Sequence, residues 1–150
     1  MLKTTFAVLA AAMTMSLAQT ASAQELNIAK EWTHRQNGGQ QIFAAPGGLE
    51  GLSINPAAEL ASRGTPKAAL DSVISQFRTQ YPTLKMMGEC RLTSNTAVAF
   101  LQRPGTNGWV GERVQVGLDQ GGATVVVFWS PAARFPAEHT HLFGQPPACI

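Results

Sequence analysis

The sequence of 150 residues has few of the features that mark several large classes of protein. Only 13% of its residues are charged, and eleven Lys and Arg stand against nine Asp and Glu without forming a basic block or stripe. A nucleic-acid partner therefore has no electrostatic support. The glycine motifs that cradle phosphates, GxxxxGK[ST] and GxGxxG, are absent, so nucleotide binding has no sequence signal either.

Catalytic motifs and long apolar runs are lacking as well. The best match to the nucleophile elbow GxSxG, at residues 51–55, reads Gly-Leu-Ser-Ile-Asn and ends in Asn55 where a glycine belongs. Beyond the N-terminal segment no run reaches the roughly 18 apolar residues that a membrane helix needs. We therefore expect a mature protein that does not span a membrane. An enzyme whose active site carries no recognisable motif stays open as one alternative.

The N-terminal segment has the three parts of a secretory signal peptide. Lys3 gives a basic start, residues 6–17 are apolar, and Ala21 and Ala23 place small side chains at the −3 and −1 positions of a cleavage site. We expect residues 1–23 to be cleaved and residues 24–150 to form a single domain, which is a common size for one domain. The expected location is secreted or periplasmic.

The two cysteines are Cys90 and Cys149. Export would place them in an oxidising compartment, where two thiols generally pair, so we predict a disulfide between them. A redox-active pair would favour the CxxC spacing, which this chain does not have. The predicted bond ties the C-terminal tail to a strand of the fold.

The clearest helix signal lies at residues 66–80. Thr65 can cap it, Pro66 suits its first turn, and Pro82 ends it. The large apolar residues follow the spacing i, i+3, i+4 and i+7: Leu70, Val73, Ile74 and Phe77. This stripe predicts a helix that packs its apolar side on a sheet.

The sheet is predicted mainly from residues 96–130, where three apolar or β-branched runs are separated by Pro, Gly and Asn turns. A hairpin around Asn37-Gly38-Gly39, a short strand at 49–54 and a strand at 85–92 add to it. We predict an α+β fold with an antiparallel sheet of about five to six strands and the 66–80 helix on one face. Residues 131–150 contain four prolines, and we expect an irregular tail, allowing a turn of helix near 137–142.

The pair His139-Thr140-His141 is the candidate metal site. On an extended strand residues two apart point the same way, so both imidazoles could bind one Cu or Zn ion. Glu138, His34 or Met86 could supply a third ligand. The alternative is a pair of solvated histidines in the tail, and otherwise the sequence implies no cofactor.

The candidate binding surface lies around the turn at residues 103–108. Trp109 opens a strand beside this Gly-rich turn, and Arg103 and Asn107 lie next to it, so the three residues could contact a partner. We expect Trp109 to be exposed and Trp129 to lie in the core. Glu112 with Arg113 could be a buried acid or an exposed ion pair, and we expect the exposed pair.

The element order (a hairpin, a short strand, a capped helix and a meander of longer strands) resembles the α/β sandwich of PsbP- and Mog1-like proteins over roughly residues 32–130. The chain departs from that family in its proline-rich tail, because the fold usually adds a helix after its last strand. The resemblance implies a non-catalytic binding or accessory role. We therefore expect an exported, non-enzymatic domain that binds a protein or cell-envelope component, with a periplasmic metal-binding protein as the alternative.

Overall fold

The computed structural model describes residues 15–16 and 25–149. Apart from Met15–Ser16, which form strand β1 and pair with β2 (Glu25–Leu26), the predicted signal peptide lies outside the described residues. Cleavage after Ala23 would remove β1. No helix among the described residues is long and apolar enough to cross a membrane.

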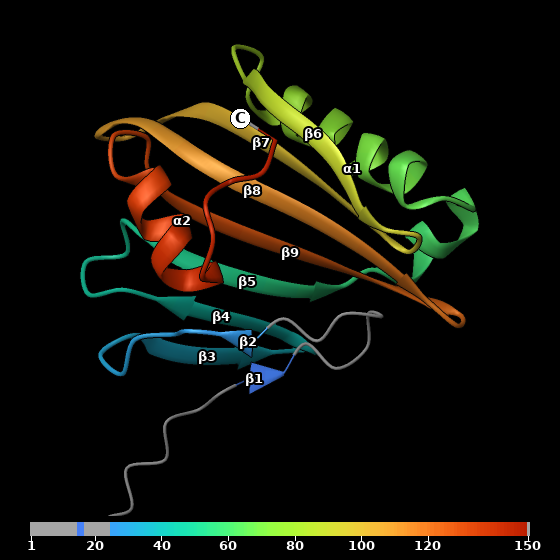
Figure 1. Ribbon diagram of the computed structural model, residues 1–150, viewed down its shortest axis with the longest axis horizontal. Coiled ribbons are helices and arrows are strands. Elements are labelled where there is room, and N and C mark those ends of the chain that lie inside the picture. Colours follow the sequence, from blue (N-terminus) through green and yellow to red (C-terminus); the bar gives the residue numbers. More distant parts are fainter. Residues whose placement is uncertain (1–14, 17–24, 150) are drawn as a thin grey trace, which may run out of the picture.

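Seven strands form one antiparallel sheet in the order β3-β4-β5-β9-β8-β7-β6 (Figure 1). Their bounds are β3 Thr33–Asn37, β4 Gln40–Ala44, β5 Gly51–Pro56, β6 Lys85–Thr93, β7 Thr96–Gly105, β8 Gly108–Asp119 and β9 Gly122–Pro131. The predicted α+β class and antiparallel sheet are confirmed, but five to six strands were too few. The short β5 is a full member, because it pairs with β4 on one side and with β9 on the other.

The turn that joins β3 to β4 has the geometry that its sequence predicts. Gly38 and Gly39 have φ of 55° and 88°, and Asn37 pairs directly with Gln40. Positive φ at both central residues gives the two strands the right-handed twist of a tight hairpin, and glycine adopts it without steric cost. Residues 27–32 connect β2 to β3 without forming a strand.

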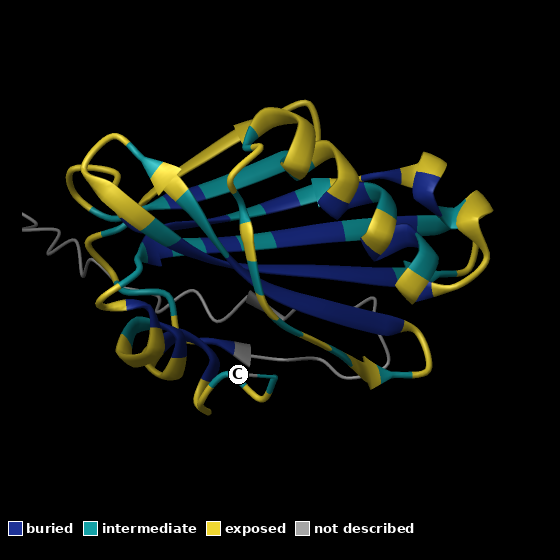
Figure 2. Cartoon of the chain, turned by 90° about the horizontal axis from the view of Figure 1, so that it is seen from above, coloured by how far each residue is buried: buried dark blue, intermediate teal, exposed yellow. Residues whose placement is uncertain are grey.

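Helix α1 (Pro66–Gln80) covers one face of the sheet, as predicted. Thr65 Oγ1 accepts a hydrogen bond from the Ala68 amide, and Pro66 lies in the first turn. Leu70, Val73 and Ile74 are buried against β7, β8 and β9 together with Leu60 of the short 3-10 helix η1 (Ala58–Arg63). Figure 2 shows the buried residues concentrated along the central strands and the exposed ones on the outer side of α1.

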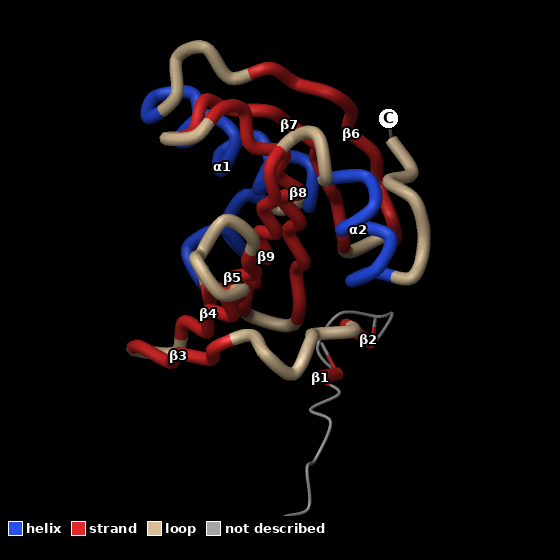
Figure 3. Tube along the Cα trace, turned by 90° about the vertical axis from the view of Figure 1, so that its left-hand side faces the viewer, coloured by secondary structure: helices blue, strands red, loops and turns tan. Residues whose placement is uncertain are grey.

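Helix α2 (Phe135–Phe143) covers the opposite face, so the sheet lies between two helices (Figure 3). The expectation of an irregular tail was wrong here. Pro136 lies in the first turn of α2, Gly144 ends it with φ of 72°, and the buried side chains follow helical spacing: Phe135, His139, Leu142 and Phe143. The spacing of the apolar residues therefore predicts α2 better than the proline content does, because proline is tolerated in the first turn of a helix.

The helix α2 and the sheet approach each other closely at Gly111 of β8. A methyl group built at this position would lie 2.6 Å from Cγ of Phe135, so any larger side chain would push α2 away from the sheet. The ring of Phe135 contacts Phe100 and Phe128 of neighbouring strands, at centroid distances of 6.3 and 5.5 Å. Phe135 thus anchors the start of α2.

The disulfide between Cys90 and Cys149 is present, with Cα atoms 6.0 Å apart, which confirms the predicted pairing. It fastens the segment after α2 to the edge strand β6. A side chain at Gly88 would overlap the backbone carbonyl of Cys149, so the tail lies directly against β6 at this point. The chain end is therefore tied to the sheet by a covalent bond and by close packing.

Candidate functional sites at one end of the sheet

The predicted surface residues Arg103, Asn107 and Trp109 line one cavity of about 180 Å³. Leu49 and Trp129 also contribute to its wall. Its lining comes from the β7–β8 hairpin, from Gly48 and Leu49 of the β4–β5 loop, and from the end of β9. We call this the hairpin cavity.

Two large apolar side chains at the hairpin cavity are exposed. Trp109 is 39% exposed, as expected, and Leu49 is 48% exposed. The Nζ atom of Lys85 lies 4.3 Å from the centre of the Trp109 ring. Trp129, which we expected in the core, is only partly buried, and its indole nitrogen donates to the carbonyl of Gly48 at 3.4 Å. Aromatic and apolar groups are thus accessible next to a cation, a combination common in protein interfaces.

Arg103 has partners within the fold. Its Nε atom lies 2.5 Å from Oε1 of Glu112, and its guanidinium carbon lies 4.8 Å from the centre of the Tyr81 ring. Glu112 is buried, and burial raises the pKa of its carboxyl group while Arg103 opposes this rise. The expected exposed ion pair between Glu112 and Arg113 was therefore wrong: both residues are buried, and Glu112 pairs across to β7.

A second cavity, of about 410 Å³, adjoins the first, and Leu49 lines both. We call it the acidic cavity. Glu50 and Arg134 form an ion pair in it, with Nη2 of Arg134 2.8 Å from Oε1 of Glu50. Glu138 of α2 and Trp32 also line it. Three separate parts of the sequence, within residues 27–32, 45–50 and 134–142, therefore line this space.

Glu50 has an unusual environment for a carboxylate, because it is only 8% exposed. Burial raises the pKa of Glu50, and the nearby Glu138 raises it further through its charge and a side-chain hydrogen bond, while Arg134 lowers it. Two acidic groups and one arginine thus share a small volume. Converging ionisable groups in a cavity are a recognised sign of a functional site.

The two histidines proposed as metal ligands lie in α2, not on a strand. Successive residues of a helix turn by about 100°, so His139 and His141 point to different sides. His139 is buried and its Nδ1 atom lies 3.1 Å from the carbonyl oxygen of Gln145, whereas His141 is exposed at the acidic cavity. The structure does not bring the two rings together.

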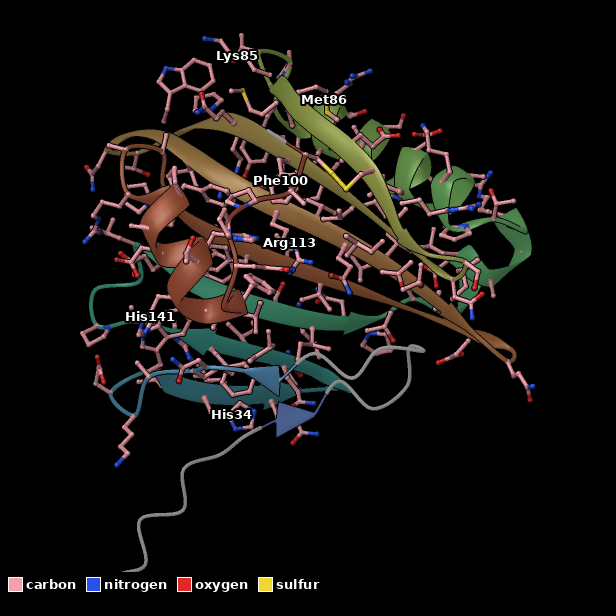
Figure 4. All side chains as sticks on the ribbon, in the orientation of Figure 1. His34, Lys85, Met86, Phe100, Arg113 and His141 are labelled. Atoms are coloured by element: carbon pink, nitrogen blue, oxygen red, sulfur yellow. A yellow bond between two sulfur atoms is a disulfide. The ribbon has the colours of Figure 1, made fainter. Side chains whose placement is uncertain are left out.

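Of the suggested third ligands, Glu138 lies in α2 and lines the acidic cavity with His141, whereas the other two do not line it. His34 belongs to β3 and Met86 to β6, the two opposite edges of the sheet (Figure 4). Within residues 15–16 and 25–149 no group of three or more His, Cys, Asp or Glu is arranged to hold a metal ion. Binding of Cu or Zn by His139 and His141 stays a prediction, which calorimetric titration of the wild type and of the double alanine variant tests.

A buried polar cluster under α2 escaped the sequence analysis. Arg113 is 3% exposed, and its Nη2 atom donates to Oε1 of Gln115 at 2.7 Å. Among residues 15–16 and 25–149, none forms a hydrogen bond with its Nε and Nη1 atoms or with the Nε2 atom of His139. Alternation along β8 places Arg113 and Gln115 on one face, but periodicity alone gave no sign that a helix would cover that face.

Comparison with known proteins gives no functional identification. No family model and no curated protein matches this chain. Among solved structures, a protein of unknown function from Pseudomonas aeruginosa is similar with a TM-score of 0.49 and 11% sequence identity, over 73% of this chain and 89% of that one. A similarity at this level carries no argument about function.

Proposed function

We propose that this protein is an exported, non-enzymatic domain that binds a protein or cell-envelope component in the periplasm or outside the cell. The contact surface is the hairpin cavity and its rim. One observation carries the proposal: Arg103, Asn107 and Trp109, selected from the sequence, line one cavity that also has the exposed Leu49 in its wall. Accessible tryptophan beside apolar and basic groups is characteristic of interface centres.

Further features are consistent with this proposal. The disulfide suits an oxidising compartment, and α1 and α2 cover the two faces of the sheet so that the end with the hairpin cavity stays accessible. The resemblance to PsbP- and Mog1-like sandwiches is part of the proposal, and it rests on element order. That order includes a helix after the last strand, where the sequence predicts an irregular tail with at most a turn of helix.

Site-specific photo-crosslinking in living cells tests the proposal. A photoreactive residue at Asn107, in the turn between β7 and β8, should give a discrete crosslinked product. The matched control is Ser94, an exposed turn residue at the other end of β7. Trp109→Ala should abolish the product at position 107, because it removes the largest exposed ring.

The outcome that contradicts the proposal is the same set of products from positions 107 and 94, or none from position 107. Arg103 is not a suitable target for this test. Its removal would leave the buried Glu112 without its partner, which destabilises the fold independently of binding.

A further inference from the structure

We propose that the acidic cavity is a binding site for an organic cation, an alkylammonium or guanidinium group on an aliphatic stem. This site is separate from the hairpin cavity, and the inference does not depend on the function proposed above. It rests on the charge of the lining, on the position of Arg134 and on the apolar parts of the wall.

The charge of the lining favours a cation. Glu31, Glu50 and Glu138 line the cavity, and Arg134 is the one lysine or arginine among the lining residues. Three carboxylates against one guanidinium leave a formal charge of −2 when His141 is neutral. A cation entering this space gains attraction that is stronger than in open water, because Glu50 is buried.

The position of Arg134 indicates where a cation can bind in the acidic cavity, next to the carboxylate of Glu50. Its guanidinium group pairs with Glu50 at 2.8 Å, although 54% of the Arg134 side chain is exposed. Because the Arg134 end of the pair is exposed, an external cation can exchange with this guanidinium group while the buried Glu50 keeps a cationic partner. We regard Arg134 as an internal competitor that occupies the position of the ligand.

The proximity of Glu50 and Glu138 supports the same inference. Burial is the main cause of the raised pKa of Glu50, the charge of Glu138 adds to it, and Arg134 opposes it. A cation bound beside both carboxyl groups would reduce their repulsion and favour the ionised form of Glu50.

The rest of the wall suits an aliphatic stem. Trp32 supplies an aromatic ring, and Pro46, Leu49 and Leu142 supply apolar surface. An aromatic ring beside carboxylates is a recurring arrangement for binding ammonium and guanidinium groups. The same chemistry is found in free polyamines and in the lysine and arginine side chains of peptides, so the test must separate these two sources.

Calorimetric titration of the full exported protein, with its disulfide intact, tests the inference. The probes are spermidine, Nα-acetyl-lysine methylamide and Nα-acetyl-arginine methylamide, with Nα-acetyl-norleucine methylamide as the uncharged control. We expect saturable binding of cationic probes and none of the norleucine compound. Tighter binding of the amino-acid derivatives indicates a peptide source, and tighter binding of spermidine indicates a free amine.

Two variants make the expected result specific. Glu138→Gln should weaken cation binding about tenfold, because one charge-assisted contact is lost. Arg134→Gln should strengthen it, because the internal competitor is gone. Glu59→Gln, which changes an exposed carboxylate on η1 outside the cavity, should leave affinity unchanged, and so should Trp109→Ala at the hairpin cavity. Thermal melts verify that each variant is folded.

Several results would overturn the inference. They are equal binding of the lysine and norleucine probes, no saturable binding of any cationic probe at millimolar concentration, or an affinity that Arg134→Gln lowers. Zinc chloride is titrated in parallel. Zinc binding that Glu138→Gln abolishes, without binding of the organic cations, would also contradict it.

Discussion

The guanidinium carbon of Arg113 lies 3.9 Å from the centre of the Phe143 ring, between the sheet and α2. No carboxylate of the described residues forms a salt bridge with Arg113, and burial lowers its pKa to about 10. A guanidinium group is costly to bury when, within the described part of the chain, its partners are one ring and one amide. The face of the sheet under α2 therefore carries a local destabilising element.

Replacement of this buried charge should stabilise the fold. Arg113→Met retains an unbranched side chain that can fill the space beside Phe143 and removes the unpaired charge. We expect the free energy of unfolding to rise by about 1–3 kcal/mol, measured by urea denaturation. A loss of stability of similar size would show that Arg113 has a favourable partner that this account does not include.

His139 should make stability depend on pH. Burial lowers the pKa of His139 to about 4, the nearby Arg113 lowers it as well, and the Nδ1 contact with Gln145 opposes the change. In the unfolded chain the pKa lies near 6.5, so between pH 6.5 and 4 the unfolded state binds a proton that the folded state does not. The free energy of unfolding should fall as pH drops through this window.

The difference between variants isolates this effect from other titrating groups. His139→Gln should flatten the pH dependence between 6.5 and 4, whereas His141→Gln, which changes an exposed residue of the same helix, should retain it. Denaturation curves at several pH values give both slopes. Equal slopes for His139→Gln and the wild type would contradict the account.

The packing of α1 on the sheet predicts a large cost for a small side chain at its centre. Leu70 is fully buried, and Leu70→Ala should lower the free energy of unfolding by about 2–5 kcal/mol through lost burial and the cavity left behind. Gln76→Ala, on the exposed side of the same helix, should change it by less than about 0.5 kcal/mol. A loss below about 1 kcal/mol for Leu70→Ala would mean that α1 does not cover the sheet.

The disulfide should stabilise the domain substantially. Cys90 and Cys149 are 59 positions apart, and closing a loop of this length contributes about 4 kcal/mol in the chain-entropy description. Reduction should therefore lower the melting temperature and expose two thiols to titration.

Gly88→Ala should slow reformation of the disulfide after reduction, because its methyl group would overlap the Cys149 backbone. Unchanged kinetics of reformation would contradict the observed packing.

The main helix and the meander could be predicted from sequence because their signals are local. Thr65 and Pro66 mark where α1 begins, and the tight turns of β7, β8 and β9 follow Gly and Asn positions. Helix α2 was expected only as a turn near 137–142 within an irregular tail. The four prolines of residues 131–150 favour irregular chain, but Pro136 lies in the first turn, where it breaks no hydrogen bond.

The candidate sites depend on pairings that a single sequence does not reveal. Arg103, Asn107 and Trp109 are close in sequence, so their gathering at one cavity could be anticipated. The acidic cavity could not, because Glu50 and Arg134 lie 84 positions apart and meet only after β5 pairs with β9. His139 and His141 were interpreted on the assumption of a strand, and the helix separates them.

The affinity of the purified protein for the component crosslinked at position 107 tests the central claim most directly. The account predicts that Trp109→Ala weakens binding about tenfold or more, while Ser94→Ala, at the other end of β7, leaves the dissociation constant unchanged. Equal affinities for the wild type and Trp109→Ala would contradict the claim that the hairpin end of the sheet is the binding surface.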